Sequence, residues 1–562
     1  MFALVGRRLG AAADRSFLVK RNIFHEASKI FTSDSETHLP TDVNFVDYVW
    51  KDYKKWERKF ALTCGISGRN FTYGQTFGAF DRLSVNLPSE LNLKSGDVVA
   101  VLLPNMPEFP ITFFGAASAG LIISPLNPLY TPDELRKLLA CSKAKVVVTI
   151  ASLLPKVRSA FEKSPGGEMP VILVGEDDTE KDVISFEKLI SKDVRGIPRL
   201  EKPGPENVVV LPFSSGTTGS PKGVVLTHLN LVANVNSCSH PHAIWNFETG
   251  DDSTIGVIPF FHIYGLVILI GITISRGNRL ITLPKFDPNT FVNALKTYKP
   301  SYLFLVPPLI HHIARSPQIT SEMLSNLKMV GTGAAPINSK IIDEFLEKTK
   351  NAGTIVKNGY GMTETSGGAT SMQESLQPNQ QEISIGKIIS NAEVKIVGEK
   401  DEALPLGEEG ELWIRGPHIM KGYLDNDQAT KEILTEDGWL RTGDVARMHA
   451  DGSIYIVDRL KELIKVNGFQ VSPTELEGLL ITMPGVADVA VIGVPHNEQG
   501  EVPRAFVVKR EGLEITAKEV EHFLEPKVAK FKRLGGGVQF VDEIPKSAAG
   551  KILRRNLKAM IR

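Results

Sequence analysis

The sequence predicts an α/β protein with two domains. We expect a large N-terminal domain of parallel α/β sheets with a part made of short strands, followed by a smaller α+β C-terminal domain. First, the chain has 562 residues, more than one hydrophobic core usually organises. Second, short apolar runs alternate with helix-length segments, which indicates parallel strands joined by crossovers. Third, after two acidic turns at 398–402 and 407–411 the pattern changes to short strands with tight turns.

The same changes of pattern predict the domain boundaries. Residues 1–43 form an N-terminal extension, because the globular pattern begins at Asn44. Residues 44–459 form the large domain. Residues 460–562 form the small one, with the boundary near Asp458.

The elements are predicted from their apolar periodicity in chain order. In the first half we expect a helix from 45, a strand at 71–75 that leads into a helix ending near 86, strands at 97–103, 145–150 and 169–174, and a helix at 109–120. In the second half we expect strands at 279–283, 301–306, 411–415, 453–457, 489–494 and 504–508, and helices at 288–298, 473–483 and 516–523. Ser472 followed by Pro473 is a typical helix start.

Composition excludes several classes of protein. Lys+Arg and Asp+Glu both number 64, so no global field favours nucleic acid. The three cysteines form no Cys-x-x-Cys pair, so we expect no disulfide framework or zinc site, and a reducing compartment. The apolar stretch 255–273 is long enough to span a membrane. Pro259, His262 and Gly265 interrupt it, however, and we expect a buried strand, turn and helix there.

The first 22 residues are basic. Five Lys/Arg face the single acid Asp14, with apolar residues interspersed, which is typical of a mitochondrial presequence. The alternative is a disordered basic terminus on a cytoplasmic protein. The last residues, 559–562, carry no Ser-Lys-Leu peroxisomal address.

The segment 211–224 is the most informative stretch of the chain. Five hydroxyl residues, three glycines and one lysine lie within 214–223, between apolar runs that predict a strand on each side. Turns rich in glycine present backbone N–H groups to anions, and hydroxyls and a lysine add donors. The expected ligand is a polyphosphate, although the common P-loop spacing is absent. The predicted contacts are Ser214, Ser215, Gly216, Thr217, Thr218, Gly219 and Lys222.

A second candidate site covers residues 358–364. Tyr360 lies between glycines, and we expect a tightly turned backbone that presents its ring to a purine. Thr363 is a donor for a phosphate, and Glu364 is a hard oxygen ligand suited to Mg²⁺. The amide of Asn358, next to Gly359, is suited to an adenine amino group.

These motifs resemble those of the adenylate-forming superfamily, in its acyl-CoA synthetase branch. The resemblance rests on Ser-Ser-Gly-Thr-Thr-Gly-x-Pro-Lys-Gly at 214–223 and Gly-Tyr-Gly-x-Thr-Glu at 359–364, and matches extend over about residues 45–560 in the family order. It implies an ATP-dependent carboxylic acid–CoA ligase that forms an acyl-adenylate and releases AMP and pyrophosphate. It also implies that the part made of short strands is small and barrel-like and that the C-terminal domain is mobile. The implied substrates are a small carboxylate, ATP and CoA, with Mg²⁺ as cofactor. The oligomeric state stays open.

The resemblance also implies roles for residues beyond the two motifs. Asp444 and Arg459 grip the ribose, and the small residues Gly333, Ala334 and Ala335 line the acyl and adenine pockets. In the C-terminal region, the implied roles belong to five residues: Lys461 (hinge), Lys465 (phosphate contact), Gly468 and Gln470 (CoA-side loop) and Lys551 (catalytic lysine). Lys222, His262 and Lys551 are the three catalytic candidates.

The acyl substrate is predicted from the segment around Phe-His-Ile-Tyr-Gly at 261–265, which resembles 4-coumarate–CoA ligases. His262 is expected to gate or orient the carboxylate, with Tyr264 and Ile268 beside the acyl group. The aliphatic run 267–270 favours a medium- or long-chain fatty acid over a 4-coumarate-like acid.

Three other functions are considered against the same motifs. An amino-acid adenylation domain needs an acid near 260–264, and none is present. A luciferase-type oxygenase shares the adenylation step, and the motifs do not exclude it. An adenylate-binding protein without turnover is disfavoured, because Lys222, Glu364 and Lys551 are all present.

Overall fold

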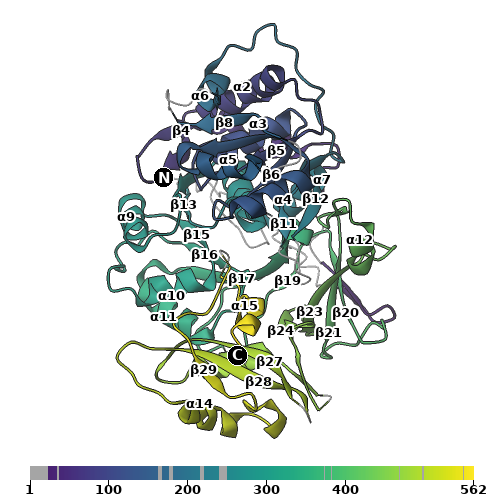
Figure 1. Cartoon of the computed structure of the whole chain (residues 1–562), viewed down its shortest axis with the longest axis vertical. Coiled ribbons are helices and arrows are strands. Elements are labelled where there is room, and N and C mark those ends of the chain that lie inside the picture. The colour runs from purple at the N-terminus through teal and green to yellow at the C-terminus, as the bar shows by residue number, and fades with distance from the viewer. Residues whose placement is uncertain are drawn as a thin grey trace, which may run out of the picture.

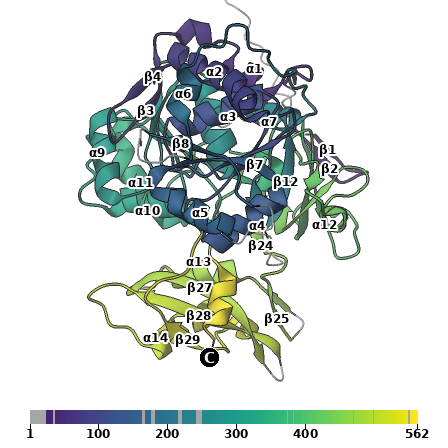
Figure 2. The same ribbon diagram turned by 45° about the horizontal axis from the view of Figure 1, so that its top comes forward.

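The computed structural model describes residues 23–33, 37–162, 167–175, 182–214, 221–239, 250–372, 374–380, 382–467, 469–496, 499–547 and 550–561. Over these residues the strands form two nine-stranded sheets, one six-stranded sheet and one five-stranded sheet. Figures 1 and 2 show the five-stranded sheet in a small yellow-green unit at one end of the molecule, next to a much larger body.

The first nine-stranded sheet has the order β11-β12-β10-β6-β5-β7-β8-β9, and β22 pairs with β12. From β10 to β9 all neighbours are parallel, which confirms the expected crossovers. Its strands are β5 (Val98–Val101), β6 (Ile122–Pro125), β7 (Ala144–Ile150), β8 (Val171–Val174), β9 (Ile184–Ser185), β10 (Val208–Val210), β11 (Phe213–Ser214), β12 (Lys222–Thr227) and β22 (Gly422–Tyr423).

The second nine-stranded sheet has the order β19-β18-β17-β16-β15-β13-β14-β3-β4. It is parallel from β17 to β3 and antiparallel at both edges. Its strands are β3 (Phe60–Cys64), β4 (Asn70–Thr72), β13 (Ser253–Gly256), β14 (Arg279–Thr282), β15 (Tyr302–Leu305), β16 (Met329–Thr332), β17 (Ile355–Met362), β18 (Gly367–Ser371) and β19 (Lys387–Ile388).

Helices begin where local capping signals predict them. Thr72 and Thr131 each form a capping box, and Asp287 precedes a proline at the first turn. The α-helices of the larger body are α1 (Phe45–Trp50), α2 (Tyr73–Leu91), α3 (Glu108–Ser118), α4 (Pro132–Ser142), α5 (Leu154–Glu162), α6 (Phe186–Ser191), α7 (His228–Cys238), α8 (Ile272–Ser275), α9 (Pro288–Tyr298), α10 (Pro307–Arg315), α11 (Ser339–Thr349) and α12 (Asp427–Ile433).

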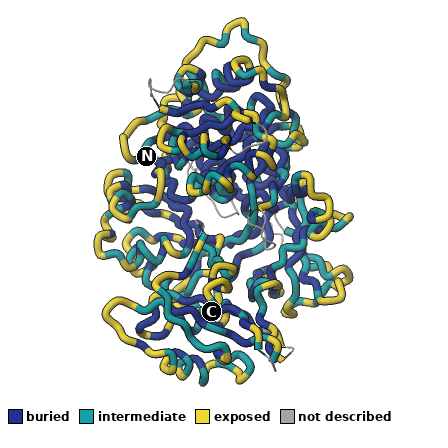
Figure 3. The backbone as a smooth tube through the Cα atoms, viewed as in Figure 1, coloured by how far each residue is buried: buried dark blue, intermediate teal, exposed yellow. Residues whose placement is uncertain are grey.

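The two large sheets are layered with helices. One face of the first sheet packs on α4 and α5, and one face of the second packs on α9, α10 and α11. The inner faces of both sheets share one core with α1, α2, α3, α6 and α7. Figure 3 shows this continuous buried centre, with exposed residues at the periphery. The same core also includes residues of the six-stranded sheet, such as Ile396 and Leu412. It therefore fixes the strand ends that carry the candidate site residues.

The six-stranded sheet corresponds to the part expected to be barrel-like. Its neighbours are antiparallel in the order β1-β2-β20-β21-β23-β24. The strands are β1 (Ile23–His25), β2 (Ile30–Thr32), β20 (Glu393–Val397), β21 (Gly410–Arg415), β23 (Leu440–Met448) and β24 (Ile454–Arg459). β1 and β2 come from the segment predicted as an extension, so ordered pairing begins ahead of Asn44.

The small C-terminal unit is an α+β sandwich. Its sheet packs on α13 and α14 on one face and on α15 through Leu557 on the other. Its elements are β25 (Ile464–Val466), β26 (Phe469–Val471), α13 (Pro473–Leu480), β27 (Val486–His496), β28 (Gly500–Lys509), α14 (Ala517–Leu524), β29 (Val538–Phe540) and α15 (Arg554–Ala559).

The apolar stretch 255–273 is buried as expected, but its helix has an unexpected form. Residues Tyr264–Gly271 form a π-helix, η3, that continues into α8. A Cβ on Gly265 would lie 2.1 Å from the Pro259 carbonyl oxygen, so only glycine allows this approach to the preceding turn. π-Helical turns are rare and frequently occur at functional sites. Over the described residues, no helix combines the length and apolarity that a membrane span requires.

Candidate active site

The predicted phosphate loop begins and ends on two paired strands. β11 and β12 place Ser214 directly opposite Lys222. The Ser214 hydroxyl oxygen is buried and lies close enough to the Tyr423 hydroxyl to act on its pKa. The Lys222 ammonium lies 4.9 Å from the ring centroid of Tyr423. A buried hydroxyl and a nearby ammonium are suitable donors for an anion.

The remaining predicted residues of this loop lie outside the described residues: Ser215, Gly216, Thr217, Thr218 and Gly219.

The backbone around Tyr360 differs from the expected tight turn, and that prediction is wrong. Tyr360 lies within strand β17, and the chain reverses later, through the short 3₁₀ helix η5 (Thr363–Thr365) into β18. A Cβ on Gly361 would lie 1.7 Å from the Gly367 carbonyl oxygen. The glycine is therefore required by the close approach of the next strand, and the turn residue is Ser366, with φ at 57°.

Tyr360, Asp444 and Arg459 form one connected group. The Tyr360 hydroxyl donates to Asp444 Oδ2 at 2.5 Å, and Arg459 Nε lies 3.2 Å from Asp444 Oδ1. β23 and β24 pair Asp444 directly with Arg459, which explains why these two residues meet. Burial, followed by the Asp444 charge, raises the pKa of Tyr360 well above its ordinary value, so the phenol stays a donor. Both oxygens of this buried carboxylate are thus engaged within the protein.

The small residues predicted beside the nucleotide lie at the end of β16, against β17. A Cβ on Gly333 would lie 2.7 Å from the Gly359 carbonyl oxygen, so the two segments touch through their backbones. Ala334 has a φ of 68°, a left-handed conformation that is strained for a residue with a side chain. Ala335 is half-buried beside it. Asn358 Nδ2 donates to the Ser384 carbonyl at 3.0 Å, which fixes the amide so that its Oδ1 is the acceptor.

Glu364 is buried and positioned by a residue from a distant strand. Its Oε1 accepts a hydrogen bond from the Tyr423 hydroxyl at 2.9 Å, and its carbonyl accepts one from Met420. Thr363 is half-buried beside it. Among the described residues no cluster of three His, Cys, Asp or Glu side chains is present. One buried carboxylate fits Mg²⁺ of the kind that is bound by one or two carboxylates together with substrate phosphates.

Lys551 comes from the small unit, and the charges of Arg459, Asp444 and Glu364 act on it. Burial is the main cause that lowers its pKa to about 8, followed by the charge of Arg459, while Glu462, Asp444 and Glu364 act in the opposite direction.

The lysine-bearing segment also touches the larger body. A Cβ on Gly550 would lie 3.1 Å from Pro308 Cγ, at the start of α10, and Gly550 has a φ of 77°. Ser547 and Lys551 close this loop: Ser547 N donates to the Lys551 carbonyl at 2.7 Å, and Lys551 N donates to Ser547 Oγ at 3.2 Å. The structure therefore brings Lys551 to a site built by the other domain.

The residues predicted to contact the acyl substrate surround the start of η3. Tyr264 N donates to Nδ1 of His262 at 3.3 Å, and burial lowers the pKa of His262 to about 4, so its imidazole is neutral at pH 7. The Tyr264 hydroxyl donates to the Gly331 carbonyl at 3.2 Å. Ile268 is buried, and its side chain lies 3.2 Å from the position that a Cβ of Gly367 would occupy.

The predicted hinge and CoA-side residues lie elsewhere. Lys461 is exposed in a turn after β24, and Lys465 is exposed in β25 opposite Gln470 of β26. Gly468 lies outside the described residues. No contact found among the described residues links Lys465 to the group around Asp444.

Sequence reasoning missed Tyr423. It lies in the two-residue strand β22, pairs with Val224 of β12, and contacts both Lys222 and Glu364. Its role depends on a strand pairing between residues about 200 positions apart, and the local sequence Gly-Tyr carries no signal for it.

Two family models match the chain. The model described as "AMP-binding enzyme" matches residues 49–424, and the model described as "AMP-binding enzyme C-terminal domain" matches residues 475–551.

Named relatives match over nearly the whole length. A probable 4-coumarate–CoA ligase 1 of Dictyostelium discoideum is 39% identical over 514 residues, which are 88% of this chain and 91% of that protein. The 4-coumarate–CoA ligase 1 of Petroselinum crispum is 38% identical over 533 residues, 94% of this chain and 95% of that enzyme.

Solved structures with the same fold include two ligand complexes. The ATP-bound MatB from Rhodopseudomonas palustris has a TM-score of 0.81 and 27% identity, covering 92% of this chain and 99% of that one. The anthranilate CoA ligase AuaEII, in complex with anthranoyl-AMP, has a TM-score of 0.82 and 26% identity, covering 93% and 98%.

Proposed function

The chain belongs to the AMP-binding enzyme family, and from this premise we propose that it is an ATP-dependent ligase that joins a carboxylic acid to CoA through an acyl-adenylate. The observation that carries the proposal is the placement of Lys551. The Lys551 loop of the small unit touches Pro308 of the larger body at Gly550, and the charges of Arg459, Asp444 and Glu364 act on the lysine there. These are the charges that an adenylating site needs, and 4-coumarate–CoA ligases match over most of both domains.

In the first step, the substrate carboxylate attacks the α-phosphorus of ATP. A bond forms from carboxylate oxygen to phosphorus, and the bond to the pyrophosphate oxygen breaks. Lys222 and the Ser214 hydroxyl neutralise and hold the leaving pyrophosphate, and Lys551 stabilises the charge that develops between carboxylate and α-phosphate. Asp444 and Arg459 hold the ribose side of the nucleotide.

Glu364 is the residue that would hold Mg²⁺, which supplies charge neutralisation to the phosphates when bound. Tyr423 holds one carboxylate oxygen of Glu364 in place. His262, neutral at pH 7, orients the substrate carboxylate without adding a charge.

In the second step, the CoA thiol releases its proton to solvent and its sulfur attacks the acyl carbonyl carbon. A thioester forms, and AMP leaves with the electron pair of the broken acyl–oxygen bond. We propose that the small domain rotates about Lys461 between the steps. Rotation removes Lys551 and presents the segment with Lys465, Gly468 and Gln470 to CoA.

The test separates the two steps. In Lys551→Ala, ATP–pyrophosphate exchange should fall by about 10²–10³-fold, since one electrostatic donor contributes on that scale. Thioester formation from supplied acyl-adenylate should persist. Equal loss of both activities would contradict the alternation of domains. If no carboxylic acid stimulates AMP formation, with or without CoA, the proposed ligase activity is wrong.

For the acyl group, we propose a medium- or long-chain fatty acid, with a 4-coumarate-like acid as the competitor. The support is the apolar side chains of η3, among which Ile268 packs against β18 at Gly367. Ile268→Ala opens space between η3 and β18 and should shift the preferred fatty acid to a longer chain. A preference for hydroxycinnamates that Ile268→Ala leaves unchanged would refute this choice of acid.

We also propose a mitochondrial location. The support is the basic, interspersed pattern of residues 1–22. These residues lie outside the described part of the structure.

A further inference from the structure

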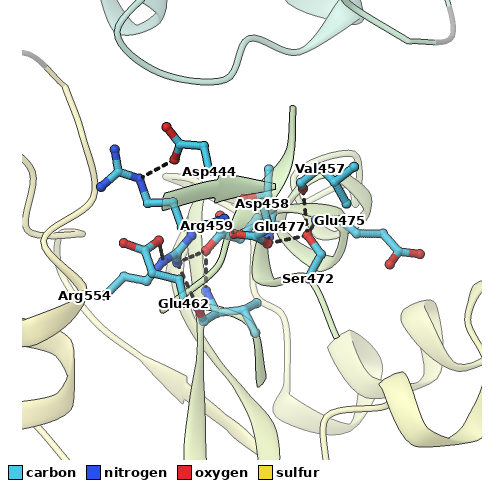
Figure 4. A network of polar contacts seen from close by, with 11 residues as sticks. Asp444, Val457, Asp458, Arg459, Glu462, Ser472, Glu475, Glu477 and Arg554 are labelled. Atoms are coloured by element: carbon cyan, nitrogen blue, oxygen red, sulfur yellow. Dashed lines mark hydrogen bonds and ion pairs between the residues drawn. The ribbon is translucent and has the colours of Figure 1, made fainter. Parts of the chain in front are cut away.

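Arg554 lies three residues after Lys551, at the start of α15, and its guanidinium is held by three partners. Nε lies 2.6 Å from Glu462 Oε2. Nη1 and Nη2 face the two carboxylate oxygens of Glu477, the second at 3.1 Å. Nη1 also donates to the Val491 carbonyl at 2.8 Å. Figure 4 shows the guanidinium between the two carboxylates.

These charges are largely removed from water. The side chains of Arg554 and Glu477 are only 11% and 12% exposed, and that of Glu462 is 23% exposed. Burial raises the pKa of Glu477, with the Arg554 charge opposing it. Taking charges out of water is costly unless the geometry is good and the remaining donors are satisfied. A bidentate pair with an added backbone acceptor meets that condition and defines the direction of the chain at Arg554.

The helix that carries Glu477 is itself docked on the larger body. At its N-terminus, Ser472 caps α13 and donates to the Asp458 carboxylate, and Thr474 N donates to Asp458 Oδ2 at 3.1 Å. Ser472 Oγ also lies 3.1 Å from the Val457 carbonyl. Asp458 is a buried residue of β24. Figure 4 shows this second set of contacts beside the first.

One continuous path therefore joins the lysine loop to the nucleotide side of the site. Asp458 directly precedes Arg459, which pairs with Asp444. α13 is anchored at its N-terminus to Asp458 and, in its second turn, holds Arg554 through Glu477. Because helices and strands are stiff, this path fixes the position of the segment that precedes Arg554, which includes Lys551.

We propose that Arg554 is a positioning residue for the adenylation step: through Glu462 and α13 it sets the Lys551 loop in line with the Asp444–Arg459 pair. This proposal rests on the proposed function. It concerns the adenylation step, because that is the step in which Lys551 acts. Lys551 supplies the charge, and Arg554 acts only through it.

The chain offers a matched control. Arg555 is the next residue in α15, has the same side chain, and is exposed. Arg554→Gln should lower the kcat of ATP–pyrophosphate exchange at least about tenfold, while thioester formation from supplied acyl-adenylate changes less than about twofold. Arg555→Gln should leave both activities unchanged. Arg554→Lys should recover only part of the loss, because lysine keeps the charge but not the bidentate geometry.

The decisive measurement is made in the Lys551→Ala background. If Arg554 acts through Lys551, adding Arg554→Gln causes no further loss of exchange. Additive losses, or equal losses in both half-reactions, would show that Arg554 only stabilises the fold and would overturn the proposal.

A second variant guards against misfolding. Glu462→Gln leaves the Arg554–Glu477 pair intact, and it should lower exchange in the same selective way, with an unchanged melting temperature. Unaltered exchange in Glu462→Gln would also count against the proposal. Absence of pyrophosphate exchange in the unaltered enzyme with every acid would instead refute the proposed function, and this inference with it.

Discussion

The depressed pKa of Lys551 predicts a specific pH dependence for adenylation. Burial lowers this pKa from 10.5 to about 8. A lysine titrates from charged to neutral as the pH rises, and only the charged form neutralises the α-phosphate and carboxylate. The kcat/KM for ATP, which reports the free enzyme, should therefore decline above pH 8.

The size of the decline follows from the titration. With a pKa of about 8, the charged fraction falls about tenfold between pH 7 and pH 9, whereas a lysine at 10.5 would stay charged over that range. In the complex with ATP, the phosphate charges favour the charged ammonium form of Lys551. The decline of kcat with rising pH should therefore begin at a higher pH than the decline of kcat/KM.

The assay is ATP–pyrophosphate exchange measured from pH 6.5 to pH 9.5 at constant ionic strength, with Lys551→Arg as the control. The guanidinium stays charged throughout. The kcat/KM of this variant should therefore show no decline near pH 8, even if its maximum value is lower. A decline that persists unchanged in Lys551→Arg would assign the titration to another group and refute the reasoning. Thioester formation from supplied acyl-adenylate should show no decline from Lys551.

Two further predictions follow from contacts at single residues, and a third follows from the N-terminal sequence. Tyr423→Phe keeps the ring beside Lys222 but removes the donor that orients the buried Glu364 carboxylate. Loss of a partner that orients a metal ligand typically weakens metal binding about tenfold or more, so the KM for Mg·ATP should rise about tenfold. An unchanged KM would show that Glu364 needs no such support. Gly333→Ala places a Cβ 2.7 Å from a backbone oxygen and should lower both the melting temperature and the rate of ATP–pyrophosphate exchange. The control is Gly478→Ala in α13, where nothing lies within 4 Å; it should raise the free energy of unfolding by about 0.5–1 kcal/mol. Residues 1–43 fused to a fluorescent protein should direct it to mitochondria, and a diffuse cytoplasmic signal would contradict the predicted presequence.

Elements with local signals were predicted well from the sequence. The helix expected at 288–298 is α9, because Asp287 caps it and Pro288 fits its first turn. The strand expected at 145–150 lies within β7, because a continuous apolar run is what a strand buried on both faces requires.

Features set by tertiary approach were not predictable in this way. The π-helix η3 depends on Gly265 passing close to the Pro259 carbonyl, and the strand conformation of Tyr360 depends on the approach of Gly367 to Gly361. A glycine in the sequence shows only that an unusual conformation is allowed. Whether it serves a turn or a close crossing is decided by a strand elsewhere in the chain.

Asp444 shows what this means for nucleotide binding. Its carboxylate accepts from Tyr360 at one oxygen and faces Arg459 at the other, so a ribose that bonds to it replaces or shares existing partners. Exchanging one hydrogen bond for another contributes little net free energy. The ribose contact therefore selects the orientation of the nucleotide more than it stabilises the complex. Most of the affinity is therefore expected from the phosphate side of the site, where the Lys222 ammonium and the buried Ser214 hydroxyl lie on paired strands.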